Sequence, residues 1–266
     1  MTIDVRDRSQ SYGRVEVISR KDFTREFGRE YGSGQHVTAL GPTGKGKTVL
    51  SKQLLKATIG PKRKALILHG KIKNKDHVVQ EMEKDLNMRT VSKWPPDKEW
   101  GDRKRNGFIL VPLTHAAGSI EEENQILARE FRKGIHDNYA NTRSDTITLV
   151  DESHQAQETL GLKKDLEGPL MRGAPHNAEW NNVQRGRYVS YHCYDAPEHL
   201  FVFYDPDQSN RQRYSEIGGV DPHYLMAITE GLKTYTVKRG KTGKATISEC
   251  LYIRRSGPQL MIVDVK

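Results

Sequence analysis

Residues 41–48 have side-chain types and a spacing that can hold a nucleoside triphosphate. Their sequence, GPTGKGKT, fits the pattern G-x-x-x-x-G-K-[ST]. Glycines let the backbone curl so that its N–H groups point at phosphate oxygens, and the following helix presents its positive end to the same anion. Lys47 is expected to reach the β- and γ-phosphates, and the Thr48 hydroxyl to ligate Mg²⁺. The residues predicted to bind ATP are Gly41, Pro42, Thr43, Gly44, Lys45, Gly46, Lys47, Thr48 and Val49.

Two adjacent acids, Asp151 and Glu152, follow the apolar run TITLV. Asp151 is predicted to hold Mg²⁺, directly or through water, and Glu152 to polarise an attacking water as the catalytic base. A hydrolase needs a water-activating glutamate and a phosphotransfer kinase does not, so the pair favours ATP hydrolysis. His154, two residues further on, fits a structural or conformational role better than that of a metal ligand.

A third polar position is Gln184, within the segment WNNVQRGRYVS at 180–190. In multi-strand P-loop hydrolases, the strand beside the acidic strand often ends in a polar residue that faces the γ-phosphate. Gln184 lies where that sensor is expected. Arg172, Arg185 and Arg187 are nearby in the sequence. An arginine at the rim of a nucleotide site can stabilise transition-state charge, often from a neighbouring subunit, and the sequence leaves the choice among the three open.

These residues belong to a chain of 266 residues with a formal net charge of +9. That length can bury a substantial core, and a basic surface favours polyanions, nucleic acid first. Basic residues cluster beside glycine or turn signals at 60–65, 101–107, 211–213 and 237–244, which places them on loops. No apolar run approaches the ~20 residues of a membrane span. The presence of only two cysteines fits a reducing cytoplasm.

The elements that must position the candidate residues alternate between strand and helix. Apolar runs predict strands at 36–40, 64–70, 108–113 and 145–152. Helical spacing predicts helices at 47–57, 75–88 and 119–140, the last capped by Ser119. Further strands are expected at 199–205 and 259–265, with a hairpin between 234–239 and 245–255. The alternation predicts an α/β fold with a mostly parallel sheet covered by helices on both faces.

We expect one domain made of three parts. An N-terminal extension spans 1–35, an ATPase core spans 36–230, and antiparallel strands at 231–266 form a C-terminal extension. The sequence contains no internal repeat and no low-complexity segment that would suggest another organisation.

Four stretches of the sequence resemble the HerA/FtsK-type P-loop motor ATPases, a group that includes small phage and viral genome-packaging ATPases. In order, they are GQHVTALGPTGKGKTVLSKQLL, ITLVDESH, NNVQRGRYV and YDAPEHLFVFYDPDQSNRQRYSEIGG, and together they cover roughly residues 34–220. The last two are the most informative, because many unrelated families share the first. One departure precedes Gln184, where the polar sequence AEWNN replaces the group's usual apolar strand.

The resemblance implies a RecA-like (ASCE) P-loop NTPase core and a ring of identical subunits, pentameric or hexameric. It also implies ATP-driven movement along double-stranded DNA without sequence preference. By the same resemblance, Arg172 falls nearest the group's trans-acting arginine. The other functional residues it implies are Lys47 and Thr48 for ATP and Mg²⁺, Asp151 for Mg²⁺, Glu152 as the base and Gln184 as the sensor.

We therefore expect a DNA translocase that packages a viral genome in the host cytoplasm, with portal or capsid proteins as partners. Cellular translocases of the group carry membrane helices or further domains, whereas only about 35 residues precede the first core strand here. Candidate DNA-gripping loops are 101–105 and 238–244. Two alternatives remain: a conjugative or secretion-type DNA-transfer ATPase, which depends on a membrane partner, and a nucleotide-dependent assembly switch with slow turnover.

Overall fold

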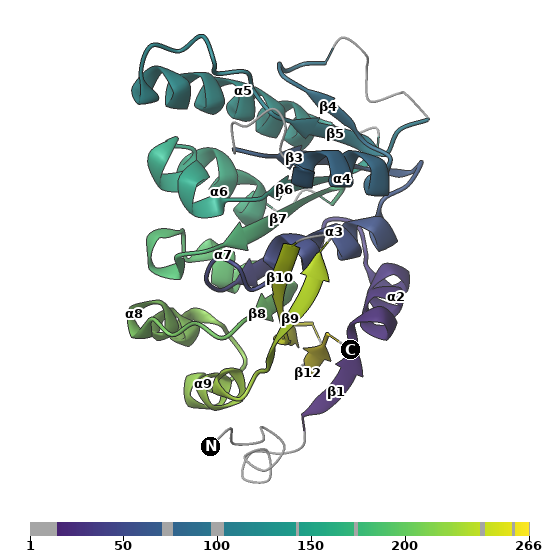
Figure 1. The fold of residues 1–266 in the computed structure, drawn as a ribbon, viewed down its shortest axis with the longest axis vertical. Helices are drawn as coiled ribbons and strands as arrows, with labels where there is room; N and C mark the ends of the chain where they lie inside the picture. The colour runs from purple at the N-terminus through teal and green to yellow at the C-terminus, as the bar shows by residue number, and fades with distance from the viewer. Residues whose placement is uncertain are drawn as a thin grey trace.

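The computed structural model describes residues 15–70, 77–96, 104–141, 144–172, 175–239, 243–256 and 259–265. A ten-stranded sheet runs along the length of the described part of the molecule (Figure 1). From one edge to the other, its strands are β1 (Glu16–Ser19), β12 (Gln259–Asp264), β11 (Cys250–Arg254), β8 (His199–Val202), β2 (Val37–Leu40), β7 (Asn177–Val183), β6 (Asp145–Val150), β3 (Arg63–Leu68), β5 (Gly107–Leu110) and β4 (Arg89–Val91).

From β8 to β4, each strand pairs in parallel with the next one in this order. β7 lies between β2, which leads into the predicted phosphate loop, and β6, which ends just before Asp151. Every residue of β2 and of β7 is buried. Because parallel strands end at the same edge of a sheet, the segments that follow β2, β6, β7 and β8 meet there.

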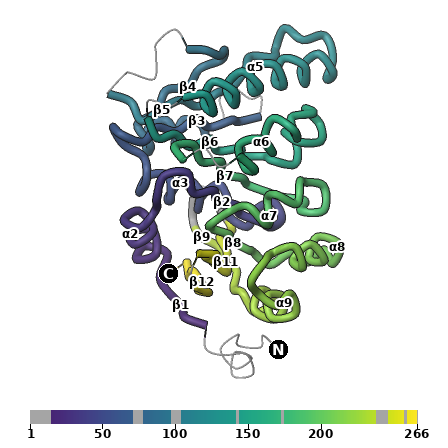
Figure 2. The backbone as a smooth tube through the Cα atoms, turned by 180° about the vertical axis from the view of Figure 1, so that it is seen from behind, coloured from purple at the N-terminus to yellow at the C-terminus, as the bar shows by residue number. Residues whose placement is uncertain are grey.

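Helices cover both faces of the sheet, as Figures 1 and 2 show from opposite sides. One face carries α2 (Arg20–Glu30), α3 (Lys47–Thr58) and α4 (His77–Leu86). The other face carries α5 (Ile120–Ala140), α6 (Lys163–Arg172) and α9 (Pro222–Glu230), with the short helices α7 (His192–Asp195) and α8 (Gln208–Arg211) between α6 and α9. None of the described helices has both the length and the apolarity that crossing a membrane requires.

Alternation along the strands divides the core between the two faces. In β3, Ala65 and Ile67 pack with α3 and α4, whereas Leu66 and Leu68 pack with α5. α5 begins where its cap predicts, because Ser119 Oγ accepts a hydrogen bond from the backbone N–H of Glu122. The mostly parallel α/β fold with helices on both faces is confirmed.

The segment 245–255, expected as one strand, is divided at Glu249 between two sheets. β10 (Gly243–Ser248) pairs only with β9 (Thr234–Arg239) in an antiparallel hairpin, whereas β11 enters the main sheet antiparallel to β8 and β12. The Glu249 N–H donates to Lys233 O (2.9 Å), and the Glu249 carboxylate accepts from Lys233 N (2.8 Å). The single-strand prediction was wrong because this pairing holds Glu249 at the base of the hairpin, for which strand patterning gives no signal.

The part of the chain expected as an N-terminal extension contributes β1 and α2. β1 pairs in parallel with β12, and α2 packs against the sheet through Phe23 and Phe27. The proposed boundaries at residues 36 and 231 stay predictions.

Candidate nucleotide-binding site

The predicted phosphate loop connects β2 to α3 at the edge where the parallel strands end. Residues 41–46 form the loop, and Lys47, Thr48 and Val49 lie in the first turn of α3. Gly41 N donates to Val183 O at the end of β7 (3.1 Å), and Phe203 N donates to Leu40 O (2.8 Å). The neighbouring strands β7 and β8 therefore hold the start of the loop from both sides.

Gly41 meets two conditions that only glycine satisfies. Its φ is +148°, a backbone conformation that side chains with a Cβ rarely adopt. A Cβ at this position would also lie 2.7 Å from the Cβ of Phe203. The loop thus passes so close to the residue after β8 that its first glycine is fixed by packing as well as by backbone conformation.

Lys47 is buried and lies against the backbone of the loop. Its Nζ donates to Gly41 O (2.5 Å) and to Pro42 O (2.8 Å). A phosphate bound in the loop would offer the ammonium charged acceptors, which make stronger hydrogen bonds than neutral carbonyls do. The position of Lys47 fits its predicted role as a phosphate ligand.

Thr48 and Asp151, the two residues predicted to hold Mg²⁺, are in direct contact. Thr48 Oγ1 donates to Asp151 Oδ1 at 2.8 Å, and Asn182 Nδ2 donates to the same oxygen at 3.0 Å. His69 Nδ1 lies 3.1 Å from the other carboxylate oxygen, Asp151 Oδ2. A hydroxyl and a carboxylate side by side at the end of a phosphate loop are oxygen ligands of the kind that Mg²⁺ takes together with substrate phosphates. The residues present therefore fit a Mg²⁺ site.

The Asp151 carboxylate is kept ionised although it is buried. Burial raises the pKa of Asp151, but hydrogen bonds from His69, Thr48 and Asn182, together with the charge of His69, bring the pKa below its ordinary value. Three partners also fix the orientation of the carboxylate. Such a group is suited to holding a cation and not to exchanging a proton.

Glu152, Gln184 and Thr43 form a chain of side-chain contacts between the acidic pair and the phosphate loop. Thr43 Oγ1 donates to Gln184 Oε1 (2.9 Å), and Gln184 Nε2 donates to Glu152 Oε1 (3.4 Å). Gln184 thus lies between the residue predicted as the base and the loop predicted to bind phosphate. In this position it can respond to a change at the loop and alter the orientation of Glu152.

A buried polar network in β7 supports the site, and the sequence analysis did not identify it. Ser51 Oγ of α3 donates to Asn182 Oδ1 (2.7 Å), and Ser153 Oγ donates to Asn181 Oδ1 (2.7 Å). Since Asn182 also donates to Asp151, β7 ties the phosphate-loop helix to the acidic strand. The polar sequence AEWNN is a fully buried central strand, and its asparagines are hydrogen-bonded to neighbouring elements.

The three candidate arginines lie in two different places. Arg185 and Arg187 lie one and three residues after Gln184 and are exposed at the edge of the sheet that carries the phosphate loop. The Arg187 guanidinium lies 4.4 Å from the centroid of the Tyr188 ring. Arg172 is the last residue of α6 and comes shortly before β7 begins, near the opposite edge of the sheet. Within one chain, the structure does not bring Arg172 to the other predicted site residues.

Asp205 is a second carboxylate close to Lys47 that the sequence analysis missed. It is buried after β8 and accepts hydrogen bonds from Asp207 N (2.9 Å) and Asn210 Nδ2 (3.0 Å). Burial raises the pKa of Asp205, and the charge of Lys47 acts in the opposite direction. Both Asp205 and His69 come just after an apolar strand, FVFY or LIL, and that shared position is the signal that could have identified them.

His154 and Lys45 make contacts away from the Thr48–Asp151 pair. The His154 ring lies 5.3 Å from the ring of Tyr188, between centroids. Lys45 Nζ lies 6.0 Å from the centroid of the Tyr204 ring, and Lys45 O accepts a hydrogen bond from Ser248 N in β10 (3.1 Å). These contacts are consistent with a structural role for His154.

Solved structures share this arrangement of elements. The DNA-packaging ATPase B204 from Sulfolobus turreted icosahedral virus matches with a TM-score of 0.51 and 12% sequence identity, over 88% of this chain and 98% of that chain. The genome-packaging NTPase B204 from Sulfolobus turreted icosahedral virus 2, in complex with sulfate, matches with a TM-score of 0.50 and 13% identity over the same shares. The chain has the fold of B204. No protein-family model and no curated protein matches the sequence.

The likeness to B204 confirms the expected fold, a mostly parallel α/β core of the kind that RecA-like P-loop NTPases have. At the level of fold, it agrees with the resemblance to viral genome-packaging ATPases, which the sequence analysis places in the HerA/FtsK-type group. At 12–13% identity the likeness to B204 assigns no individual side chain. The roles of Lys47, Asp151, Glu152 and Gln184 therefore rest on the geometry described above.

Proposed function

We propose that this protein hydrolyses ATP to move double-stranded DNA, as the motor that packages a viral genome. The proposal is carried by the convergence, at one edge of the sheet, of the Thr48–Asp151 contact and the chain from Thr43 through Gln184 to Glu152. Hydrolysis needs a base next to the positions that hold metal and phosphate. The fold shared with the DNA-packaging ATPase B204 supports the coupling to DNA.

Binding of the triphosphate falls to the loop and to Lys47. The Lys47 ammonium already lies against the loop backbone, so it moves little to reach a phosphate. Mg²⁺ held by Thr48 and Asp151 would neutralise charge on the phosphates. Asn182 and His69 keep the Asp151 carboxylate in one orientation, which lowers the cost of organising the site.

Glu152 acts on the water. Its carboxylate accepts a proton from the water that attacks the γ-phosphorus, while the bond from that phosphorus to the bridging oxygen breaks and releases ADP and phosphate. Gln184 contacts both Glu152 and Thr43, so it orients the base according to the state of the loop. This placement supports its role as the γ-phosphate sensor.

A ring of identical subunits would complete the site with an arginine from a neighbour. Arg185 and Arg187 are the better candidates for this arginine, because both are exposed at the edge that carries the phosphate loop. Arg172 lies near the opposite edge and could serve only a neighbouring subunit whose site faces it. Alanine substitution of each arginine in turn would identify the trans-acting one. Loss of that group lowers ATP turnover without preventing nucleotide binding.

Contact with DNA is supported by the net charge of +9. Binding through phosphate contacts is independent of sequence and weakens as salt rises. Residues 101–103 and 240–242 of the two predicted gripping loops lie outside the described residues, so 101–105 and 238–244 stay predictions. Portal or capsid proteins are the partners that a packaging motor requires.

The chemical step is tested by Glu152→Gln. Glutamine has nearly the same shape but cannot accept the proton, so turnover should fall by about 100-fold or more, while the affinity for ATP stays near that of the parent. Phosphate release and binding of a non-hydrolysable ATP analogue measure the two quantities. Glu158→Gln, an exposed acid six residues away, is the matched control. Undiminished turnover in Glu152→Gln would remove the proposed base.

The coupling to DNA is tested separately. ATP turnover is measured at low salt with and without double-stranded DNA, and again in the presence of a portal or capsid partner. We expect stimulation by DNA that decreases as salt rises, and processive movement of DNA in a single-molecule assay. Hydrolysis without stimulation or movement would contradict the motor and favour the assembly switch.

A further inference from the structure

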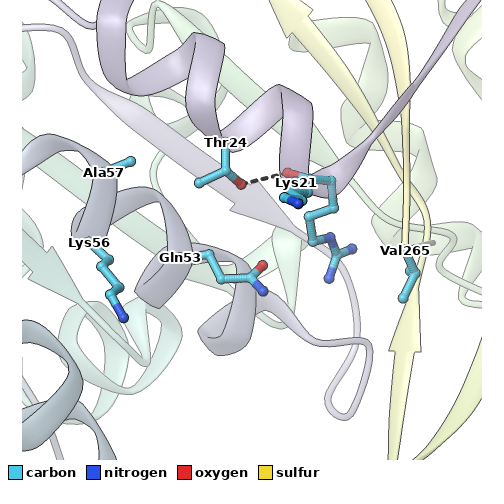
Figure 3. Close-up of a pocket in the computed structure, with 7 residues that line it drawn as sticks. Lys21, Thr24, Gln53, Lys56, Ala57 and Val265 are labelled. Carbon is cyan, nitrogen blue, oxygen red and sulfur yellow. Dashed lines mark hydrogen bonds between the residues drawn. The ribbon is translucent and has the colours of Figure 1, made fainter.

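A cavity of about 390 Å³ lies between α2 and α3, on the face of the sheet that these helices cover. Figure 3 shows Lys21 and Thr24 projecting from α2, and Gln53 and Lys56 from α3. Arg20, the first residue of α2, also lines the cavity. The described lining residues include three cations and no carboxylate. The wall of the cavity is therefore strongly positive.

Arg20 is buried to an unusual extent for a charged side chain. It is 4% exposed, and its Nη2 donates to Ser248 O (2.7 Å). Its Nε and Nη1 are buried without a hydrogen-bond partner in the described part of the chain. Leaving buried donors unsatisfied costs about 1–3 kcal/mol each, and more when the group is charged. A bound ligand that accepts hydrogen bonds from these two nitrogens would remove this cost.

Among the described residues, no acidic side chain forms an ion pair with Arg20, although the charge of Asp264 acts on it. Within the described ranges, neither Arg20, Lys21 nor Lys56 forms an ion pair. Burial lowers the pKa of Arg20, and the charges of Cys250 and Asp264 raise it without a direct contact. Asp22, beside Lys21 in the sequence, is paired with Arg25 (2.8 Å). A buried cation without a directly paired counter-ion is stabilised when an anion occupies the space beside it.

The hydrogen-bonding groups at the cavity suit an oxyanion. Arg20, Lys21 and Lys56 provide N–H donors, and the Gln53 amide can add a neutral donor, whereas the Thr24 hydroxyl already donates to Arg20 O (2.7 Å). Guanidinium groups bind phosphate through paired N–H donors. A volume of about 390 Å³ lies within the range of small-molecule sites and exceeds what one phosphate group fills. The cavity therefore has room for a phosphate group with a further part attached to it.

We propose that the cavity between α2 and α3 is a second anion site, which binds a phosphate-bearing ligand through Arg20, Lys21 and Lys56. It is separate from the phosphate loop: Gln53 lies six residues after Lys47 in α3, about 9 Å along the helix axis. The phosphate comes either from a small phosphorylated molecule or from the backbone of duplex DNA. Both present the same group, and the experiment distinguishes them.

The experiment counts anion sites by calorimetric titration with inorganic pyrophosphate at low salt. We expect two sites in the parent protein and one in Lys47→Ala, because that variant disables only the phosphate loop. In the Lys47→Ala background, Lys21→Gln with Lys56→Gln should weaken the remaining site by about tenfold or more. Arg29→Gln with Lys62→Gln is the matched control, since both residues are exposed and neither lines the cavity. The control should leave the affinity unchanged.

Arg20 itself is tested by Arg20→Met in the same background, with thermal unfolding as a check of the fold. Loss of pyrophosphate binding by a folded Arg20→Met variant supports the site. A short DNA duplex that displaces pyrophosphate from Lys47→Ala identifies backbone phosphate as the ligand, and failure to displace it identifies a small molecule.

Two results would overturn the proposal. One is a Lys47→Ala variant that binds no pyrophosphate, and the other is equal weakening by the cavity pair and by the control pair. The proposed ATPase is judged independently, by turnover of the variants in which Lys47 is intact. A failure of the second anion site is therefore distinguishable from a failure of the proposed function.

Discussion

Asp151 and Glu152 are adjacent in the sequence but have different surroundings. Asp151 is buried and has one hydrogen-bond partner just after β3, one on α3 and one on β7. Glu152 is only partly buried, and its contact with Gln184 is a long 3.4 Å. Different surroundings give two acids different roles. We assign cation binding to the buried carboxylate of Asp151 and proton transfer to the partly buried carboxylate of Glu152.

The chain from Thr43 through Gln184 to Glu152 predicts that Thr43 and Gln184 act together. Thr43→Val removes the hydroxyl that donates to Gln184, and Gln184→Ala removes both contacts. We expect each variant to lower kcat by about tenfold, with little change in KM, and the double variant to be no slower than Gln184→Ala. Steady-state kinetics on the four proteins measures the coupling. Effects that multiply in the double variant would show that the two residues act independently.

At the scale of elements, the sequence predicts the phosphate loop and its two flanking elements well. The spacing of the loop glycines, Lys47 and Thr48 fits few structures other than a phosphate loop. The apolar run of β6 places Asp151 at the end of a strand. The sequence also predicts that the two acids lie near the loop, because parallel strands end at the same edge of a sheet.

β7 was harder to predict, for a physical reason. Asn181 and Asn182 are polar residues in a buried central strand, and patterning assigns such residues to loops. They are stable there because Ser153 and Ser51, from other elements, hydrogen-bond to them. Partners supplied by tertiary structure are invisible in a single sequence. The same applies to His69, whose role depends on a contact with Asp151 across the sheet.

The close passage of the phosphate loop beside β8 predicts a sharp difference between two glycines. Gly41→Ala places a Cβ 2.7 Å from that of Phe203 in a backbone conformation that alanine rarely adopts. It should destabilise the fold by about 1–3 kcal/mol and weaken nucleotide binding. Gly60→Ala, which has open space around its Cβ, should do neither. Thermal unfolding and binding of an ATP analogue test the pair, and normal binding by Gly41→Ala would count against the loop geometry.

At the scale of the whole molecule, one buried acid should govern part of the pH dependence of stability. Glu179 is 1% exposed at the centre of the sheet, and burial raises its pKa to about 8 despite a hydrogen bond from Asn181. The unfolded chain loses this proton near pH 4.5, whereas the folded chain keeps it until about pH 8. The folded state therefore binds more protons across this interval, and stability falls as pH rises through it.

Glu179→Gln removes this dependence while preserving the shape of the side chain. The Tm of the variant should equal that of the parent near pH 4.5. At pH 8 it should be higher than that of the parent by about 3 °C or more. Thermal unfolding from pH 4.5 to 8 measures the difference. The exposed Glu121→Gln serves as the control. A Tm difference between parent and Glu179→Gln that stays constant with pH would contradict the raised pKa.

β1 and β12 lie side by side, although one comes from the first twenty residues and the other from the last ten. β12 is consequently paired along both of its sides, with β11 on one and β1 on the other. A shortened chain that began at residue 20 would leave one side of β12 with unpaired backbone groups, which can recruit a strand from another molecule. Removing the amino-terminal residues to improve expression would therefore promote aggregation through the exposed side of β12, which lies near the carboxyl terminus.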